Sequence, residues 1–323
     1  MSTLRIGVIG CGVMGSNHAR VAQQLGRAHL AAVVDSDLAR AEVLAQPTGA
    51  IASSQLEDVL THIDLAIVSV PTAAHFDTAM TCINAGLSVL LEKPIASTVE
   101  QGQQLVDAAS AAGVMLAVGH IERFNAAVAE LPKLLERPLH FTATRVNPFS
   151  PRISDGVVHD LMIHDLDIVA WLAGPERSVE HVAGVSRSTR SEREDLAIAA
   201  LRFDNGLTAM FETSRIAQQK VRTLEVVQEE SVIVADLLRQ DITIHRMSRT
   251  EFSTDDGVRY RQSSVIEVPF LDQRGEPLLR ELEDVVAAVL DSRPPRVSGA
   301  DGVRALQLAD RVTAAVVSQT GAN

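Results

Sequence analysis

The chain is poor in aromatic residues, in cysteine and in positive charge. Aromatic residues make up 3% of the 323 residues, so Ala, Val, Leu and Ile must fill the core, and few stacking platforms for bases or sugars are expected. The two cysteines, Cys11 and Cys82, lack the spacing of a metal-binding pair, which argues against a disulfide framework or a zinc site and fits a reducing cytoplasm. Because 41 acidic residues outnumber 29 basic ones, for a net charge of −12, we expect no nucleic-acid partner.

Long hydrophobic runs are also lacking. No window holds eighteen uninterrupted apolar residues, and no charged leader precedes the first apolar run at Leu4. We therefore expect a soluble cytoplasmic protein with no membrane partner. The apolar content of 46% is ample for a core, and the length suggests two domains of about 150 residues each.

The sequence pattern changes near residue 120. From Leu4 to Gly119, short β-branched runs alternate with helical stretches, which predicts an α/β arrangement with a parallel sheet covered on both faces. Beyond residue 122, alternating polar and apolar segments predict a largely antiparallel sheet. We divide the chain into domains at 1–120 and 121–323, with the last two helices packing back near the junction. The expected strands are 4–9, 29–34, 64–70, 87–91, 114–118, 139–146, 179–187, 195–203, 207–213 and 221–227, and the main expected helices are 36–45, 98–112, 159–172, 276–291 and 300–318.

A glycine-rich turn follows the first expected strand. The segment Gly10-Cys11-Gly12-Val13-Met14-Gly15 opens a helical pattern. Gly10 permits a tight turn, Gly12 lets the backbone approach a pyrophosphate, and Gly15 allows close packing of helix on strand. The segment predicts a dinucleotide-binding turn whose six residues contact the cofactor, with the pyrophosphate at the helix N-terminus. By themselves the glycines also fit an ordinary strand–helix turn.

Asp35 ends the second expected strand, twenty residues beyond Gly15. A carboxylate there accepts hydrogen bonds from both hydroxyls of an adenosine ribose, and no basic residue follows before Arg40 to pair with a 2′-phosphate, so we predict NAD rather than NADP. The alternative role for Asp35 is the N-cap of helix 36–45. Ligands collect at the carboxyl ends of parallel strands, which adds cofactor contacts from Val70, Pro71, Thr72 and His75 after the third strand and from Glu92 and Lys93 after the fourth.

The segment from Asp155 to Asp167 is dense in ionisable groups. If it is a helix, Asp160, His164 and Asp167 lie on one face. Imidazole titrates near neutral pH, so His164 is the best candidate base, and Asp160, one turn earlier, could orient its ring. A metal site or a solvated helix face are the alternatives, and we predict no metal. Lys93 would bring an ammonium near the nicotinamide, unless it is an ordinary surface lysine.

These residues together resemble a known family. Gly10 to Gly15, Asp35, Glu92-Lys93-Pro94, Gly119-His120 followed by Arg123-Phe124-Asn125, and Asp160 with His164 are similar to the glucose-fructose oxidoreductase and inositol dehydrogenase family, across both domains. The resemblance implies a Rossmann, doubly wound N-terminal domain and a C-terminal α+β domain whose open, mostly antiparallel sheet forms the substrate pocket. It also implies that Lys93, Asp160 and His164 are catalytic and that the Lys93–Pro94 bond is cis.

A narrower resemblance concerns the segments Gly119 to Asn125 and Arg145 to Arg152. They resemble family members that oxidise the C3 hydroxyl of UDP-N-acetylglucosamine with NAD. The guanidinium groups of Arg145 and Arg152 would suit a diphosphate, unless both are surface arginines. The resemblance implies substrate contacts from Lys93, Arg123, Asn125, Arg145, Arg152, Asp160 and His164.

Other functions remain compatible with the same residues. One alternative is a dehydrogenase of inositol, another polyol or a hexose phosphate, which needs no diphosphate contact. The other is a non-catalytic, NAD-binding sugar sensor, which needs no base. We expect a homodimer or homotetramer, because an exposed face of the C-terminal sheet would favour self-association.

Overall fold

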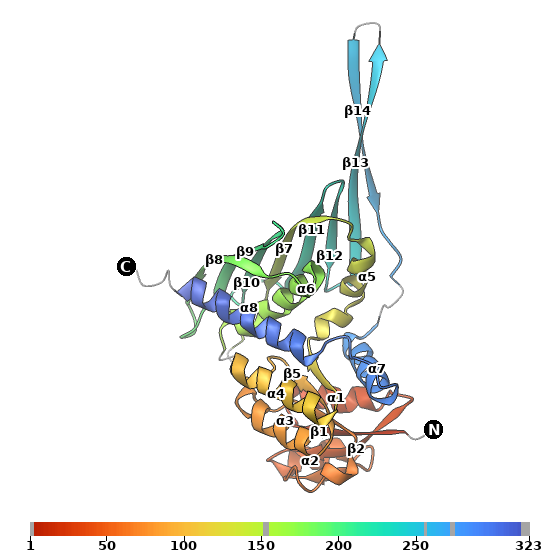
Figure 1. Cartoon of the computed structure of the whole chain (residues 1–323), viewed down its shortest axis with the longest axis vertical. Helices are drawn as coiled ribbons and strands as arrows, with labels where there is room; N and C mark the ends of the chain where they lie inside the picture. The colour runs from red at the N-terminus through yellow and green to blue at the C-terminus, as the bar shows by residue number, and fades with distance from the viewer. Residues whose placement is uncertain (1–2, 151–154, 255–256, 272–274, 318–323) are drawn as a thin grey trace. The chain divides into compact units, whose positions relative to one another are not determined.

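The computed structural model describes residues 3–150, 155–254, 257–271 and 275–317, with the backbone alone for 248–262 and Val317. The described chain forms two compact units (Figure 1). The first comprises the residues up to Phe124 together with Gly275–Gln307, and the second comprises the rest. The predicted boundary at residue 120 stays a prediction. Within the described residues, no helix combines the length and apolar character needed to cross a membrane.

A six-stranded parallel sheet forms the centre of the first unit, with strand order β3-β2-β1-β4-β5-β6. Its strands are β1 (Leu4–Ile9), β2 (Ala28–Val34), β3 (Ile51–Ser53), β4 (Leu65–Val68), β5 (Ser88–Glu92) and β6 (Leu116–Gly119). Its helices are α1 (Val13–Ala22), α2 (Leu38–Ala45), α3 (His75–Asn84), α4 (Val99–Ala112), α7 (Pro277–Leu290) and the first part of α8 (Gly299–Val317), with short 3-10 turns η1 (Leu60–His62), η2 (Thr72–Ala74) and η3 (Ile121–Phe124). This confirms the doubly wound parallel sheet.

The sheet buries both of its faces, which explains the continuous apolar runs in its strands. Ile9 lies in a core cluster on one face, with residues of α3 and α4. Ile6 and Val8 lie in a second cluster on the other face, with residues of α1, α2 and α7. A strand covered on both sides is apolar at consecutive positions rather than at alternate ones. Sequence analysis missed β3, a three-residue edge strand whose Ile51 is 41% exposed.

An eight-stranded mixed sheet forms the second unit, with order β14-β13-β12-β11-β7-β10-β9-β8. All neighbours are antiparallel except β7 and β10, which run parallel from His140↔Thr208 to Val146↔Ser214. Gly206, with φ of +85°, makes the predicted hairpin between β9 and β10. The strands are β7 (Pro138–Val146), β8 (Val179–Arg187), β9 (Leu196–Phe203), β10 (Thr208–Ser214), β11 (Val221–Gln228), β12 (Ser231–Asp236), β13 (Asp241–Thr254) and β14 (Gly257–Glu267).

One face of this sheet is buried and the other is exposed. Along β9, Ala197, Ala199 and Leu201 are buried, whereas Ile198 is 38% exposed, and β10 alternates in the same way. This alternation is typical of a sheet covered on one side. The helical elements of the unit are α5 (Ala126–Leu134), the wide π-turn η4 (Val158–Met162), α6 (Ile163–Ala173) and α8 from Leu308 onward. Sequence analysis missed α5 and β12–β14.

Candidate functional site

The glycine-rich turn has the close contacts that its three glycines predict. Gly10 has φ of +94°, and a Cβ on it would lie 2.8 Å from the backbone carbonyl carbon of Ser69. A Cβ on Gly15 would lie 1.8 Å from the carbonyl oxygen of Gly10, so α1 packs on the turn as closely as backbone allows. At Gly12, in contrast, no described atom lies within 4 Å of a Cβ position. The turn is closed on its inner side and open where a ligand would approach.

The N-terminus of α1 is suited to an anion. Gly12 precedes the helix and has no side chain to cap it, and the first turn holds no acidic residue. Its backbone N–H groups and the positive end of the helix dipole therefore stay available for a pyrophosphate. Val13, at the first helical position, is 76% exposed, and Met14 is partly buried. This geometry fits the diphosphate of NAD.

Asp35 is held in place by two backbone N–H groups. Its Oδ2 accepts from the N–H of Cys11 at 2.6 Å, and its Oδ1 accepts from the N–H of Asp37 at 2.9 Å. Partial burial works to raise the pKa of Asp35, but these hydrogen bonds outweigh it and lower the pKa, so the carboxylate is ionised. The cap of α2 is Asp37, which accepts from Ala39, so the N-cap alternative for Asp35 is wrong. An ionised carboxylate at this strand end fits the ribose of NAD and repels a 2′-phosphate.

The segment that follows β4 contains Val70, Pro71, Thr72 and His75, which are predicted to contact the cofactor. Val70 and Thr72 are partly buried and Pro71 is exposed, whereas His75 is 1% exposed. Its Nδ1 lies 2.8 Å from the carbonyl oxygen of Pro94 and its Nε2 lies 2.9 Å from that of Val70. Burial lowers the pKa of His75, although both carbonyls and the charge of Glu92 oppose the shift. His75 therefore links the segments that follow β4 and β5, and the cofactor contact predicted for it stays a prediction.

The side chain of Glu92 also has a partner within the protein. Its Oε1 lies 2.7 Å from Nε2 of His18 on α1, and both residues are buried. This pair fixes the end of β5 to α1, and the cofactor contact predicted for Glu92 stays a prediction. Lys93 follows directly, half-buried, and its bond to Pro94 is cis, as the family resemblance implies. Sequence analysis missed His18, because 74 residues separate it from its partner.

The catalytic segment predicted in the second unit begins as a π-turn and continues as α6. Asp160 lies in the π-turn and His164 in the first turn of α6, and both are partly buried. Asp167 is 2% exposed, so it lies in the interior rather than on an accessible face with the other two. Within the described residues, no group of three or more His, Cys, Asp or Glu side chains could hold a metal ion.

The substrate contact predicted for Arg145 stays a prediction. The residue is 1% exposed, and its Nε and Nη2 each donate to a different oxygen of buried Asp165 at 2.8 Å. These two bonds occupy one edge of the guanidinium group. In the structure the pair fixes the first turn of α6 to β7. Arg152 lies outside the described residues.

Arg123 and Asn125 are likewise internal. Arg123 is 2% exposed and its Nη2 donates to Asp301 at 3.1 Å, within the first unit. Asn125 is 3% exposed, its Oδ1 accepts from the N–H of Ala127 as the cap of α5, and its Nδ2 donates to the carbonyl of Leu237 at 2.8 Å. Burial and these partners give both side chains a role in the fold, and the substrate contacts predicted for them stay predictions.

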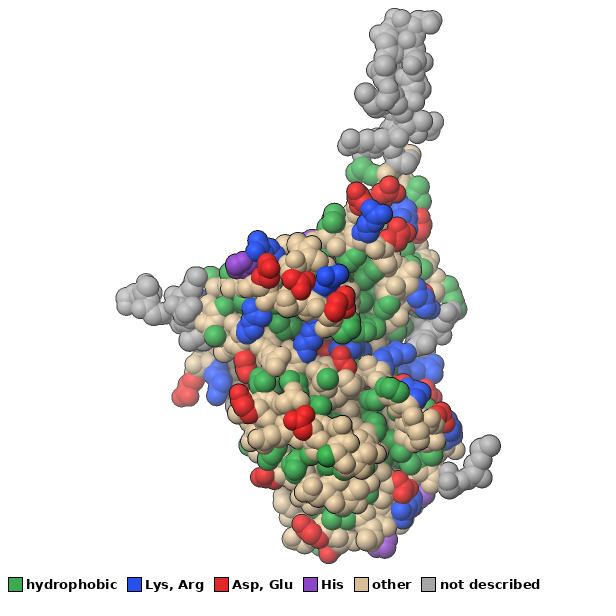
Figure 2. Space-filling view, viewed as in Figure 1, with side chains coloured by type: hydrophobic (Ala, Val, Ile, Leu, Met, Phe, Trp, Pro, Cys, Tyr) green, Lys and Arg blue, Asp and Glu red, His purple; other side chains and the backbone are tan. Residues whose placement is uncertain are grey.

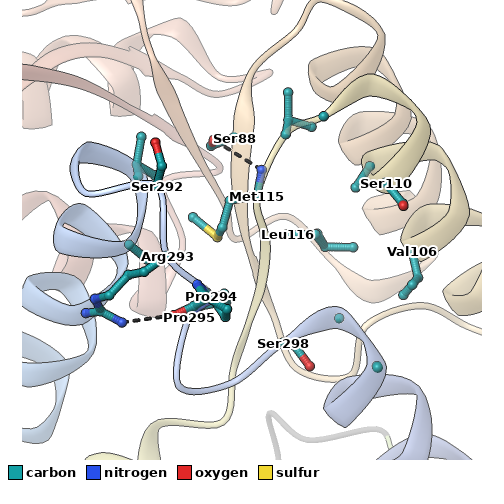
Figure 3. A pocket seen from close by; sticks show the side chains of 17 residues that line it. Ser88, Val106, Ser110, Met115, Leu116, Ser292, Arg293, Pro294, Pro295 and Ser298 are labelled. Carbon is teal, nitrogen blue, oxygen red and sulfur yellow. Dashed lines mark hydrogen bonds between the residues drawn. The ribbon is translucent and has the colours of Figure 1, made fainter.

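A cavity of about 470 Å³ lies in the first unit (Figure 3). Ser88 and Leu116, at the amino ends of β5 and β6, line it, whereas Asp35 and Lys93 follow carboxyl ends. Polar groups of its lining have partners within the protein: Ser88 accepts from the N–H of Met115, and Arg293 donates to the carbonyl oxygen of Pro294 and to the carboxylate of Asp284. We assign this cavity no part in the chemistry. Over the described surface visible in Figure 2, acidic and basic side chains are interspersed.

Comparisons with known proteins match the whole chain. A model described as an oxidoreductase family with an NAD-binding Rossmann fold matches residues 4–120, and its C-terminal alpha/beta domain matches residues 140–322. UDP-N-acetylglucosamine 3-dehydrogenase from Acidithiobacillus ferrooxidans is 31% identical over 318 residues, 98% of each chain. A solved structure of that enzyme has a TM-score of 0.90 at 30% identity, covering 100% of both chains. Myo-inositol 2-dehydrogenase from Thermotoga maritima is 28% identical over 94% of each chain.

Proposed function

Because the chain belongs to the glucose-fructose oxidoreductase and inositol dehydrogenase family, we propose that it oxidises a secondary hydroxyl of a sugar, the C3 hydroxyl of a UDP-N-acetyl sugar such as UDP-N-acetylglucosamine. It is an NAD-dependent oxidoreductase acting on CH–OH groups. The observation that carries the choice of substrate is the match to UDP-N-acetylglucosamine 3-dehydrogenase over 98% of both chains.

We propose distinct roles for three side chains. His164 removes the hydroxyl proton, and Asp160, one turn earlier, orients its ring. Lys93, next to the Glu92–His18 pair, stabilises the developing alkoxide through its ammonium charge. Bound NAD supplies the hydride acceptor. General-base help of this kind is worth about 10²–10⁴ in rate. A non-catalytic sensor would need no such set, and the presence of all three supports an enzyme.

One observation favours a second substrate class. The bidentate pair with buried Asp165 already engages Arg145, one of the two arginines proposed for a diphosphate. An uncharged polyol such as an inositol needs neither arginine, and the myo-inositol 2-dehydrogenase match covers 94% of both chains. The alternative is therefore an inositol or other polyol dehydrogenase that uses the same three side chains.

We propose that a second copy of the chain covers the exposed face of the eight-stranded sheet, giving a homodimer or homotetramer. Leu139, Ile198 and Met210 on β7, β9 and β10 are 53%, 38% and 43% exposed, which leaves apolar area available for association. Sedimentation velocity tests this, and a monomer at all concentrations would contradict it. The cytoplasm is the compartment we propose, because Cys11 and Cys82 are both buried free thiols.

A substrate panel tests the proposed function. Purified protein is mixed with NAD or NADP and with UDP-N-acetylglucosamine, UDP-glucose, myo-inositol or glucose 6-phosphate, and formation of reduced cofactor is followed by absorbance. We expect reduction with NAD and UDP-N-acetylglucosamine, and NMR of the product then locates the ketone at C3. Turnover of myo-inositol alone would replace this substrate with the polyol alternative. If none of these alcohols is oxidised with either cofactor, the proposal is overturned.

A further inference from the structure

We propose that Glu194, in the loop between β8 and β9, is a positioning residue for Asp160 and His164. Its side chain and its carbonyl oxygen hold the start of the helical segment that carries both residues. The inference rests on the proposed function, because it is those two side chains whose placement would matter. It concerns contacts within the second unit only.

The start of this helical segment is capped from a distant part of the chain. Val157, at the N-cap, is apolar and cannot cap the π-turn with its own side chain. Instead the N–H of Val158 donates to Oε1 of Glu194 at 3.3 Å, and the N–H of Val157 donates to the carbonyl oxygen of Glu194 at 3.1 Å. Two N–H groups that the helix cannot satisfy are bound in this way, and a carboxylate faces the positive end of the helix.

Gly156 shows how closely the Glu194 carboxylate approaches. A Cβ on Gly156 would lie 1.9 Å from Oε1 and 2.4 Å from Oε2 of Glu194. The φ of Gly156 is not in the positive range that favours glycine, so the constraint at this position is the space that the carboxylate occupies. Both residues are buried, with Glu194 8% exposed. A side chain at position 156 would therefore have to displace the Glu194 carboxylate.

Glu194 is itself fixed by a buried ion pair. Nε of Arg215 donates to Oδ1 of Asp195 at 2.8 Å, and Nη2 of Arg215 donates to the carbonyl oxygen of Glu194 at 3.1 Å. Arg215 is 1% exposed and Asp195 is 0% exposed. Asp195 also accepts from the N–H groups of Thr189 and Arg190 at 2.7 and 2.6 Å, which fixes these two residues of the loop as well. The backbone of Glu194 is therefore held in place.

A movement of the Glu194 side chain would be transmitted to Asp160 through Gly156 and one hydrogen bond. The N–H of Asp160 donates to the carbonyl oxygen of Gly156 at 3.0 Å, and Gly156 is the residue against which the carboxylate packs. One turn later, the Arg145–Asp165 pair fixes the beginning of α6. Glu194 and Arg145 thus hold the segment on either side of Asp160 and His164. A misplacement of reacting groups by about 1 Å can cost 10²-fold in rate.

Substitutions at Glu194 separate positioning from general damage. We expect Glu194→Ala to lower kcat by about 10- to 100-fold, with the Kd for NAD unchanged because the dinucleotide turn lies in the other unit. Glu194→Gln keeps an acceptor oxygen and should stay within about 3-fold of wild type. Glu192→Ala, at an exposed position of the same loop, is the matched control and should have no effect. A wild-type kcat in Glu194→Ala would overturn the inference.

Gly156→Ala gives a second, non-additive test. The new Cβ displaces the carboxylate, so the single variant should resemble Glu194→Ala, whereas in the Glu194→Ala background it should add no further loss. If Gly156→Ala lowers kcat equally in the wild-type and Glu194→Ala backgrounds, the proposed contact is contradicted. Wild type, the two single variants Glu194→Ala and Gly156→Ala, and the double variant are then compared by Tm and by the imidazole pKa of His164. That pKa is followed by NMR, with the His164 signal assigned through His164→Asn. These readouts need no substrate, so they test the inference even if the substrate panel fails, and an unmoved His164 pKa in Glu194→Ala would refute positioning.

Discussion

The carboxyl group of Glu281 is buried and has no hydrogen-bond partner among the described residues. This predicts an unusual dependence of stability on pH. It lies on α7, where Leu278, Leu282 and Val285 pack into the core on one face of the parallel sheet. Its exposed fraction is 1%, and neither carboxyl oxygen has a hydrogen-bond partner among the residues that the structure describes. Burial raises the pKa of Glu281 well above its usual value, and the charges of Glu92 and Asp284 raise it further.

The direction of the effect follows from proton binding. In the unfolded chain Glu281 loses its proton near pH 4.3, whereas in the folded protein it keeps the proton to much higher pH. The folded state therefore binds more protons, and the free energy of unfolding falls as pH rises between the two pKa values. The loss is about 1.4 kcal/mol per pH unit. Below the unfolded pKa, the group contributes no slope.

Glu281→Gln removes this titration while keeping the shape of the side chain. The unfolding free energy is measured by denaturant titration at pH 5, 6 and 7 for wild type and variant. We expect the variant to gain relative to wild type as pH rises, by about 1.4 kcal/mol per unit up to the folded pKa. Glu283→Gln, on the same helix but exposed and bonded to Arg280, is the control and should show no such trend. A difference between Glu281→Gln and wild type that stays constant with pH would refute the reasoning.

Three further substitutions test the site. Asp35→Ala should weaken the binding of NAD more than that of NADP, since the ribose acceptor and the repulsion of a 2′-phosphate are both lost; an unchanged ratio of the two Kd values would contradict this role. His164→Asn should lower kcat by about 10²–10⁴-fold with NAD affinity kept, and His159→Asn, whose ring bonds to Asp310, is its control. Arg145→Ala removes the bidentate partner of the buried Asp165 carboxylate, so the unfolding free energy should drop by about 3–5 kcal/mol; a selective rise in KM for UDP-sugars at unchanged stability would support the diphosphate role instead.

Local signals allowed much of the first unit to be predicted. The glycines of the turn and Asp35 are close in sequence to the elements they join, and their steric and electrostatic demands are the same in any chain. The strand β1 was predicted with its observed bounds, because every position except Arg5 is apolar or glycine and is buried in the structure.

Burial and long-range pairing could not be predicted in the same way. Arg145 reads as an exposed cation in any local window, and only the fold brings Asp165 against it across 20 residues. Glu92 is the last residue of β5 and His75 the first of α3, and both side chains bond to partners within the protein that a local pattern does not reveal. The helix α5 was missed because Pro132 interrupts its pattern, although Asn125 caps it in the usual way.

The helix α7 belongs to the core of the first unit but is synthesised late, and this has a consequence for folding. Leu278, Leu282, Val285 and Val286 complete a core whose other members lie before residue 118. A ribosome therefore makes residues 125–274 of the second unit before it makes the segment that finishes the first. A nascent chain that stops at residue 120 exposes the apolar surface that α7 covers, so expression of that fragment should yield aggregates, whereas supplying residues 275–307 in the same polypeptide should give a folded nucleotide-binding unit.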